Sequence, residues 1–279
     1  MTRATEPGSA LLMAALTATL LAAAATIMLT EARSARAASG ESLRLERARL
    51  AAQALLAEEI VALDANERTT FSGEVEDRDR GRVARQDASG LVDVNATDET
   101  ALAALFIGLG AEQETGAVLA SRVADWRDED DLVRVNGAER DDYESAGLPA
   151  PANRNFVVET EIASVLGFSS ALAACLAPYL TTHSGLSSVD SAAAPAHIRN
   201  VLALDGTGSP GASFAPFGHV IVFTADAPIS DAAMLRISAW VRLTGDPRQP
   251  FIVHRSAEEF VAAATAPQVR CFAAAEARP

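Results

Sequence analysis

Acidic residues form the densest group of side chains that could do chemistry, and they lie on both sides of a turn at Asn136 and Gly137. Carboxylate oxygens in such loops bind hard cations, calcium above all. The spacing does not fit an EF-hand, because the chain has no DxDxDG run with the Glu that closes such a loop. The cluster is therefore either a calcium site or a solvated acidic loop. The candidate ligands are Asp125, Asp128, Asp130, Asp131, Glu139 and Asp142.

The other chemically versatile residues form no recognisable catalytic group. Two carboxyl groups can cleave a glycosidic bond when their pKa values are tuned apart, which acidic residues crowded into one hydrated loop do not favour. Ser184 stands beside His183, but no GxSxG elbow surrounds it. The remaining histidines are scattered, at His197, His219 and His254. The sequence therefore predicts a protein that is not an enzyme, with a membrane-anchored periplasmic enzyme as one rival.

The cysteine count and the net charge exclude further classes. Cys175 and Cys271 are too few for a disulfide framework, so they form either one disulfide in an oxidising compartment or two small buried hydrophobes. No CxxC spacing points to zinc. The formal net charge of -14 disfavours nucleic acid as a partner, because a polyanion is repelled.

An uncharged segment near the amino terminus predicts a membrane helix. Residues 9–29 carry no charge, and about 20 apolar residues suffice to cross a bilayer as a helix. The alternative is a cleaved secretory signal, with Arg3 as its charged region and a cleavage site near residues 22–25. An amphipathic pattern then continues to Leu63, which favours one long helix with Gly40 as its weak point.

The first residues, MTRATEPG, precede the apolar helix directly, and this arrangement resembles a prepilin leader. The resemblance implies that a prepilin peptidase cuts after Gly8 and that the new terminus, Ser9, is N-methylated. Pilins usually carry Glu at the fifth mature position, where it pairs with a neighbouring subunit, whereas Met13 stands there in this sequence. Because an unpaired carboxylate in hydrocarbon is costly, Met13 suits a subunit that has no neighbour ahead of it.

Two helices around the GLG sequence at residues 108–110 form a predicted hairpin. We expect Asn95 or Thr97 to cap the first helix, and the second to run from Gly116 to Trp126. A helix-hairpin-helix often binds DNA phosphates, which gives the alternative of a membrane-anchored DNA-binding protein of an uptake system. The hairpin is instead strongly acidic, and this favours a structural role.

Several motifs together resemble the K-type minor pseudopilins of type II secretion systems (general secretion pathway protein K). They are a DxNxA stretch, a DWRDxD run, a GAE motif followed by Tyr143, and a Pro/Asn turn; these occupy residues 93–96, 125–130, 137–139 and 149–156. The resemblance covers residues 8 to about 204. K-type pseudopilins are associated with calcium. The resemblance also implies a single-pass protein of the inner membrane with its head in the periplasm. It also implies I-type and J-type minor pseudopilins as partners, together with the secretin and exported proteins.

Strand-like segments follow at residues 219–225, 235–245 and 250–255, and alternation places Leu235, Ile237, Ala239, Val241 and Leu243 on one face of an antiparallel sheet. We therefore expect a pilin-like α+β fold, in which a transmembrane and stalk helix packs on this sheet and a mainly helical domain with helix-hairpin-helix-like units is inserted. The expected segments are a leader (1–8), a transmembrane helix (9–29), a stalk helix (30–66), two pilin-like parts (67–92 and 201–279) and the inserted domain (93–200). The predicted function is a minor pseudopilin that caps the pseudopilus tip and helps to initiate its assembly.

Overall fold

The structure is a computed structural model that describes residues 7–63, 69–204, 216–263 and 270–272. Within the first helix, many side chains before Ser39 are not described. The chain divides into two compact units, Met1–Leu50 and Ala51–Pro279. Each unit is described by itself below.

The first unit holds most of helix α1 (Pro7–Val61), whose backbone is helical from Pro7 through the predicted weak point at Gly40. Gly40 has no atom near the position that a Cβ would take. Ion pairs three residues apart support the polar part of the helix, at Arg44 with Glu41 and at Arg49 with Glu46. In the apolar part, the described side chains of Leu21, Ile27, Met28 and Leu29 are exposed.

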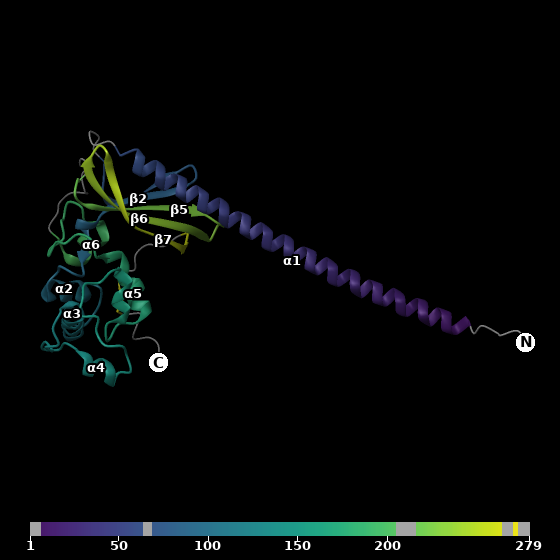
Figure 1. The fold of residues 1–279 in the computed structure, drawn as a ribbon, viewed down its shortest axis with the longest axis horizontal. Helices are drawn as coiled ribbons and strands as arrows, with labels where there is room; N and C mark the ends of the chain where they lie inside the picture. The colour runs from purple at the N-terminus through teal and green to yellow at the C-terminus, as the bar shows by residue number, and fades with distance from the viewer. Residues whose placement is uncertain (1–6, 64–68, 205–215, 264–269, 273–279) are drawn as a thin grey trace, which may run out of the picture. The chain divides into compact units, whose positions relative to one another are not determined.

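The second unit contains a five-stranded antiparallel sheet of order β1-β2-β5-β6-β7 (Figure 1). Its strands are β1 (Ser72–Arg78), β2 (Gly81–Asp87), β5 (Val220–Pro228), β6 (Ala233–Asp246) and β7 (Gln249–Ala262). The predicted alternation in β6 is confirmed, since all five residues from Leu235 to Leu243 on that face are buried. Alternating side chains point to opposite faces of a strand, so one face of β6 is covered.

The end of α1 covers that face of the sheet. Leu56 and Ile60 pack against a core that includes Phe71, Phe223 and Val241. The preceding residue, Leu55, is almost fully buried. Gly81, at the start of β2, allows the close approach of β2 to β5, because a Cβ there would lie 2.0 Å from the carbonyl oxygen of Asp226; it would also lie 3.1 Å from Leu55 Cδ1 of α1. The second unit therefore contains a helix on one face of an antiparallel sheet, as the pilin-like pattern predicts.

Residues 88–204, which we call the helical insert, connect β2 to the segment that leads into β5. In Figure 1 its helices α2 to α5 gather beneath the sheet. The insert contains α2 (Glu99–Gly108), α3 (Gln113–Arg127), α4 (Arg140–Ser145), α5 (Ser170–Leu176) and α6 (Ala196–Leu202), and the short helices η1 (Ala88–Gly90), η2 (Glu159–Ser164) and η3 (Ala177–Tyr179). Two short parallel strands, β3 (Val92–Asp93) and β4 (Leu180–Thr181), pair within it.

The insert has its own apolar core, separate from the core beneath α1. Leu102, Leu105 and Phe106 of α2 are completely buried in it, as are Tyr143 and Tyr179. Burial raises the pKa of the Tyr143 hydroxyl to about 12, although that hydroxyl accepts a hydrogen bond from the backbone N–H of Leu166. A core of this size lets the insert act as a folded body in its own right.

A disulfide joins the insert to the carboxyl-terminal segment. Cys175 in α5 is bonded to Cys271, with Cα atoms 5.6 Å apart. The backbone N–H of Cys271 also donates to the carbonyl oxygen of Leu109, and the Phe272 ring packs edge-on against Phe106. Of the two alternatives for the cysteines, the structure therefore has the disulfide.

The α2–α3 hairpin differs in detail from the prediction. Asp98 caps α2, with its carboxylate accepting from the backbone N–H of Ala101, so the prediction of Asn95 or Thr97 was wrong. The reason is that Asn95 is engaged elsewhere: it exchanges two hydrogen bonds with the backbone of Phe156. Helix α3 also begins three residues before the predicted Gly116.

Candidate functional site

The acidic loop, residues 125–142, begins in the last turn of α3 and ends in the first turn of α4. Asp125 is completely buried, and its carboxylate accepts from the backbone N–H of Ala138 (2.9 Å) and from the Arg134 guanidinium (2.9 Å). Gly137 makes this approach possible, because a Cβ at that position would lie 1.9 Å from Asp125 Oδ2. Asp125 thus fixes the far side of the loop against α3.

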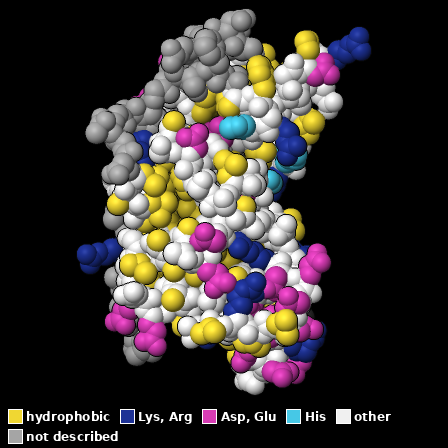
Figure 2. Space-filling view, turned by 90° about the vertical axis from the view of Figure 1, so that its left-hand side faces the viewer, with side chains coloured by type: hydrophobic (Ala, Val, Ile, Leu, Met, Phe, Trp, Pro, Cys, Tyr) yellow, Lys and Arg dark blue, Asp and Glu magenta, His cyan; other side chains and the backbone are white. Residues whose placement is uncertain are grey.

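Arg134 lies at the centre of the cluster, and the sequence reasoning missed it. Its guanidinium forms ion pairs with Asp125, Asp128 and, at 3.0 Å, with Glu99 of α2. The hydrogen bonds to Asp128 and Asp125 raise the pKa of Arg134 above its ordinary value. Arg134 is the only basic residue between Asp128 and Glu139, which is the one sequence signal that could have marked it. Figure 2 shows acidic and basic side chains close together over the lower part of the molecule, where the insert lies.

Glu139 is a carboxylate of the loop with which Arg134 forms no ion pair. The side chain is buried and faces the backbone N–H of Asp142 in a capping box at the start of α4, but neither carboxylate oxygen meets the geometry of a hydrogen bond in the described part of the chain. Burial raises the pKa of Glu139 to about 7, with further increases from the nearby Asp125, Asp128, Asp131 and Asp130. A carboxylate in this position either takes up a proton or gains a cation.

The other predicted ligands make local hydrogen bonds. Asp130 accepts from the backbone N–H of Leu132, Asp131 accepts from the Asn153 amide, and Asp142 accepts from the backbone N–H of Glu139. Among the described residues, no three acidic, His or Cys side chains converge closely enough to hold a metal ion. The structure thus brings Asp125 and Asp128 together around Arg134, with Glu139 nearby. Calcium binding stays a prediction.

The DxNxA motif lies next to the end of α3, because the Arg127 guanidinium donates to the backbone carbonyl oxygens of Val94 and Thr97. Asp93 is almost fully buried, and its carboxylate accepts from the backbone N–H groups of Asn95 (2.8 Å) and Gly185 (2.7 Å) and from the Ser184 hydroxyl (3.1 Å). Its charge is therefore fully hydrogen-bonded, as a buried charge requires. The motif closes the β3–β4 pair and carries no free polar group for chemistry.

A second charged region fixes the end of α1 to the sheet. Glu59 of α1 accepts from Arg78 (3.0 Å) and Arg85 (2.9 Å), and both arginines also bind Glu76. Glu58, one residue earlier, pairs with Arg80. Acidic and basic groups alternate here, so the network is balanced within itself.

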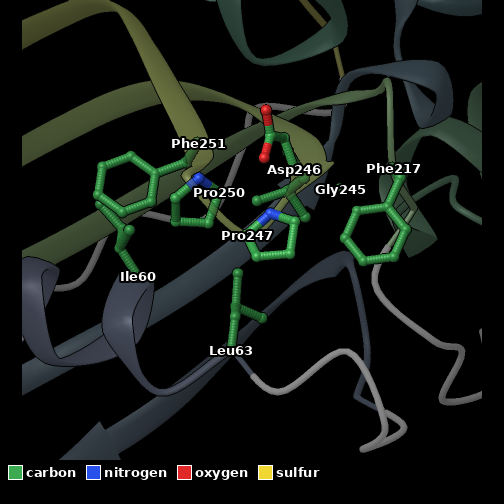
Figure 3. A pocket seen from close by; sticks show the side chains of 9 residues that line it. Ile60, Leu63, Phe217, Gly245, Asp246, Pro247, Pro250 and Phe251 are labelled. Carbon is green, nitrogen blue, oxygen red and sulfur yellow. The ribbon is translucent and has the colours of Figure 1, made fainter.

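An apolar pocket of about 210 Å³ lies where α1 ends, next to the turn between β6 and β7 (Figure 3). Ile60 and Leu63 line it from one side, and Phe217, Pro247 and Phe251 line it from the others. The Asp246 carboxylate, its only acidic lining group, accepts from the backbone N–H of Arg248. The pocket offers apolar contact and no nucleophile.

The predicted processing residues Gly8, Ser9 and Met13 lie in the helical backbone of α1, with side chains outside the described ones. The structure therefore does not test their roles. Within the part of the chain that the structure describes, no helix has the length and apolar character that a membrane span needs.

Comparisons with known proteins connect these features to one family. Residues 82–184 match the model of the family described as "Type II secretion system (T2SS), protein K". Among solved structures, the chain is similar to one in "The Crystal Structure of the GspK-GspI-GspJ complex from enterotoxigenic Escherichia coli Type 2 Secretion System", with a TM-score of 0.50 and 16% identity. That likeness covers 80% of this chain and 98% of the other, and it concerns the fold. No curated protein sequence matches the chain.

The mixed helical and antiparallel-sheet fold and the matched segment both resemble a component of a protein secretion system. The family match at residues 82–184 and the shared fold support the role of a minor pseudopilin of a type II secretion system. This confirms the resemblance seen in the sequence motifs. The comparisons give no support to the alternative of a DNA-uptake protein.

Proposed function

We propose that the chain caps the tip of the pseudopilus and helps to start its assembly. The observation that carries this proposal is the helical insert, which makes up nearly all of the region that matches protein K. A folded body added between β2 and β5 would block further subunits from joining above it. This mechanism is steric and needs no catalytic residue, so we also propose that the chain has no enzymatic activity.

The proposed position at the pseudopilus tip requires that the chain is anchored in the inner membrane. We propose that prepilin peptidase cuts after Gly8, that Ser9 is then methylated, and that residues 9–29 remain in the inner membrane with the head in the periplasm. The exposed Leu21, Ile27, Met28 and Leu29 support this, because a contiguous apolar helix surface needs either lipid or other helices to cover it. Met13 in place of the usual Glu fits a subunit with no neighbour ahead of it.

The proposed partners are the I-type and J-type minor pseudopilins. The solved structure with the similar fold is a complex of GspK with GspI and GspJ, which supports such an assembly for this chain. Contacts with the secretin and with exported proteins would follow from a tip position. Nucleic acid has no place in this proposal, in keeping with the net charge of -14.

The test is a pull-down of I-type and J-type minor pseudopilins with the full chain from membranes that contain prepilin peptidase. Gly8→Leu is expected to block processing and to abolish recovery of both partners. The matched control is Gly40→Leu, the same substitution at a helical glycine with open space around it. If Gly8→Leu is processed and retains its partners, as an enzyme with a simple anchor would retain its activity, the proposal fails.

We also propose that the acidic loop binds calcium. The buried oxygens of Glu139 and Asp128 Oδ1 support this, because they have no hydrogen-bond partner in the described part of the chain and hard cations take oxygen ligands. The side chains that would hold the ion are Glu139 and Asp128, with Asp125, Asp130, Asp131 and Asp142 as the surrounding candidates. Calcium would supply the positive charge that Arg134 alone does not.

Thermal unfolding in calcium chloride and in a chelator tests this proposal. A bound ion stabilises the native state, so calcium should raise the Tm of the native chain. Glu139→Gln is expected to remove this rise, whereas Glu129→Gln, at an exposed position outside the candidate set, should retain it. No rise in the native chain, or an equal rise in the two variants, would exclude the site.

A further inference from the structure

The contact between the helical insert and the sheet contains a cluster of titratable side chains outside the acidic loop. His183 follows β4 of the insert, and His254 lies on β7 of the sheet, with ring centroids 6.0 Å apart. Beside them, Arg255 of β7 forms an ion pair with Glu159 of η2 (2.9 Å) and stacks over Trp240 of β6 at 3.6 Å. These residues join the two cores of the second unit.

His183 is held rigidly within the insert. Its backbone N–H donates to the Thr181 hydroxyl, and the next two residues, Ser184 and Gly185, are fixed by the buried carboxylate of Asp93. The ring atom Nε2 is buried and has no hydrogen-bond partner in the described part of the chain. A ring fixed in this way cannot easily turn its buried nitrogen to water.

His254 is turned toward this junction by an irregularity in the sheet. The pairing of β6 with β7 shifts between Trp240, which faces Arg255, and Val241, which faces Val253. His254 therefore has no partner of its own on β6. An extra residue of this kind bends a strand and redirects its side chain.

The charges at the junction are balanced only while the histidines are neutral. Arg255 and Glu159 neutralise each other, and Asp93 is bound within the insert. Burial lowers the pKa of His183, Arg255 and His254 lower it further, and Glu159 and Asp93 oppose the change. A proton on His183 would add a partly buried cation beside Arg255, with no carboxylate left to pair with it.

We propose that this junction is a proton-sensitive latch, in which neutral His183 holds the insert against β7 and protonation of His183 at mildly acidic pH releases it. The sign follows from the lowered pKa of the folded state. The latch contributes its full stability above the ordinary pKa of histidine, 6.5, and loses it as the pH falls below that value toward the folded pKa. The released state would have a mobile insert while each core remained folded.

Hydrogen exchange of the full chain in detergent, at pH 7.5 and pH 5.5 with correction for intrinsic rates, tests the latch. At the lower pH, β7 and residues 180–186 should lose up to about tenfold in protection, because pH 5.5 lies one unit below the ordinary pKa of histidine. Helices α2 and α3 should keep their protection. An unchanged junction, or an equal loss in α2 and α3, would overturn the proposal.

The decisive variant is His183→Phe, which keeps a ring that cannot be protonated and is expected to remove the pH-dependent loss. His197→Phe is the matched control, because His197 is also in the insert and burial also lowers its pKa, but its ring contacts Tyr179 and Pro178. This control should lose protection at the junction as the native chain does. If His183→Phe does not fold, His183→Asn replaces it. A loss in the His183 variant equal to that of the native chain would contradict the latch.

Discussion

The helical insert and the sheet are stabilised in different ways. The sheet, with the end of α1, relies on a small core on one face and on a partly buried network in which Glu59 and Glu76 share Arg78 and Arg85. The insert has a larger core, a disulfide to the carboxyl-terminal segment, and a buried carboxylate that depends on Arg134. The charged network on the sheet is balanced within itself, whereas the insert contains the buried carboxylate of Glu139, which has no hydrogen-bond partner in the described part of the chain. The proposed calcium site therefore lies in the insert.

The largest effect is expected from Arg134→Met. This change leaves the fully buried Asp125 without its ion pair; because the Arg134 side chain is partly exposed, we expect the lower end of the cost of breaking a buried pair, about 3 kcal/mol. Urea unfolding of the full chain in detergent, followed by near-UV circular dichroism, would measure the loss of free energy of unfolding. A loss below about 1 kcal/mol, the usual value of an exposed pair, would show that the loop does not depend on Arg134.

Removal of the disulfide should come next. The double variant Cys175→Ala/Cys271→Ala frees the carboxyl-terminal segment from α5, and loss of a disulfide that closes a long loop typically costs about 2–4 kcal/mol. Urea unfolding of the variant and of the oxidised native chain gives the difference. The reduced native chain is the control and should match the variant. Equal stability of all three would mean that the insert holds the segment without the bond.

The smallest effect is expected on the sheet side, from Arg85→Met. Arg78 would still pair with both Glu59 and Glu76, so the cost should be only about 1–2 kcal/mol. The same urea titration measures it, and Arg85→Met beside Arg134→Met forms a matched pair of variants. Equal losses at the two positions would remove the proposed distinction between the sheet and the insert.

Periodic patterns in the sequence predicted much of the fold. Alternation in residues 235–243 identified the covered face of β6, and the GLG sequence at 108–110 located the α2–α3 hairpin. Both patterns depend only on residues close together in the sequence, so they can be recognised without knowledge of the tertiary structure. The cap of α2 was wrong because Asn95 bonds to Phe156, a partner far along the chain that no local rule can identify.

The candidate site was only partly predictable, for the same reason. The density of carboxylates marked the loop from 125 to 142, but density does not show which of them are buried or paired. The ion pairs of Arg134 and the buried, unpaired state of Glu139 among the described residues arise only when the fold brings α2, α3 and the loop together. The disulfide likewise depended on bringing α5 next to Cys271, across 96 residues of sequence.

The mass of the mature amino terminus, measured on native chain purified from membranes, tests the central claim most directly. The proposed anchoring predicts a chain that starts at N-methylated Ser9 and keeps the apolar segment 9–29. A chain that starts near Ala25, recovered free from the periplasm, would contradict membrane anchoring and with it the proposed position at the pseudopilus tip.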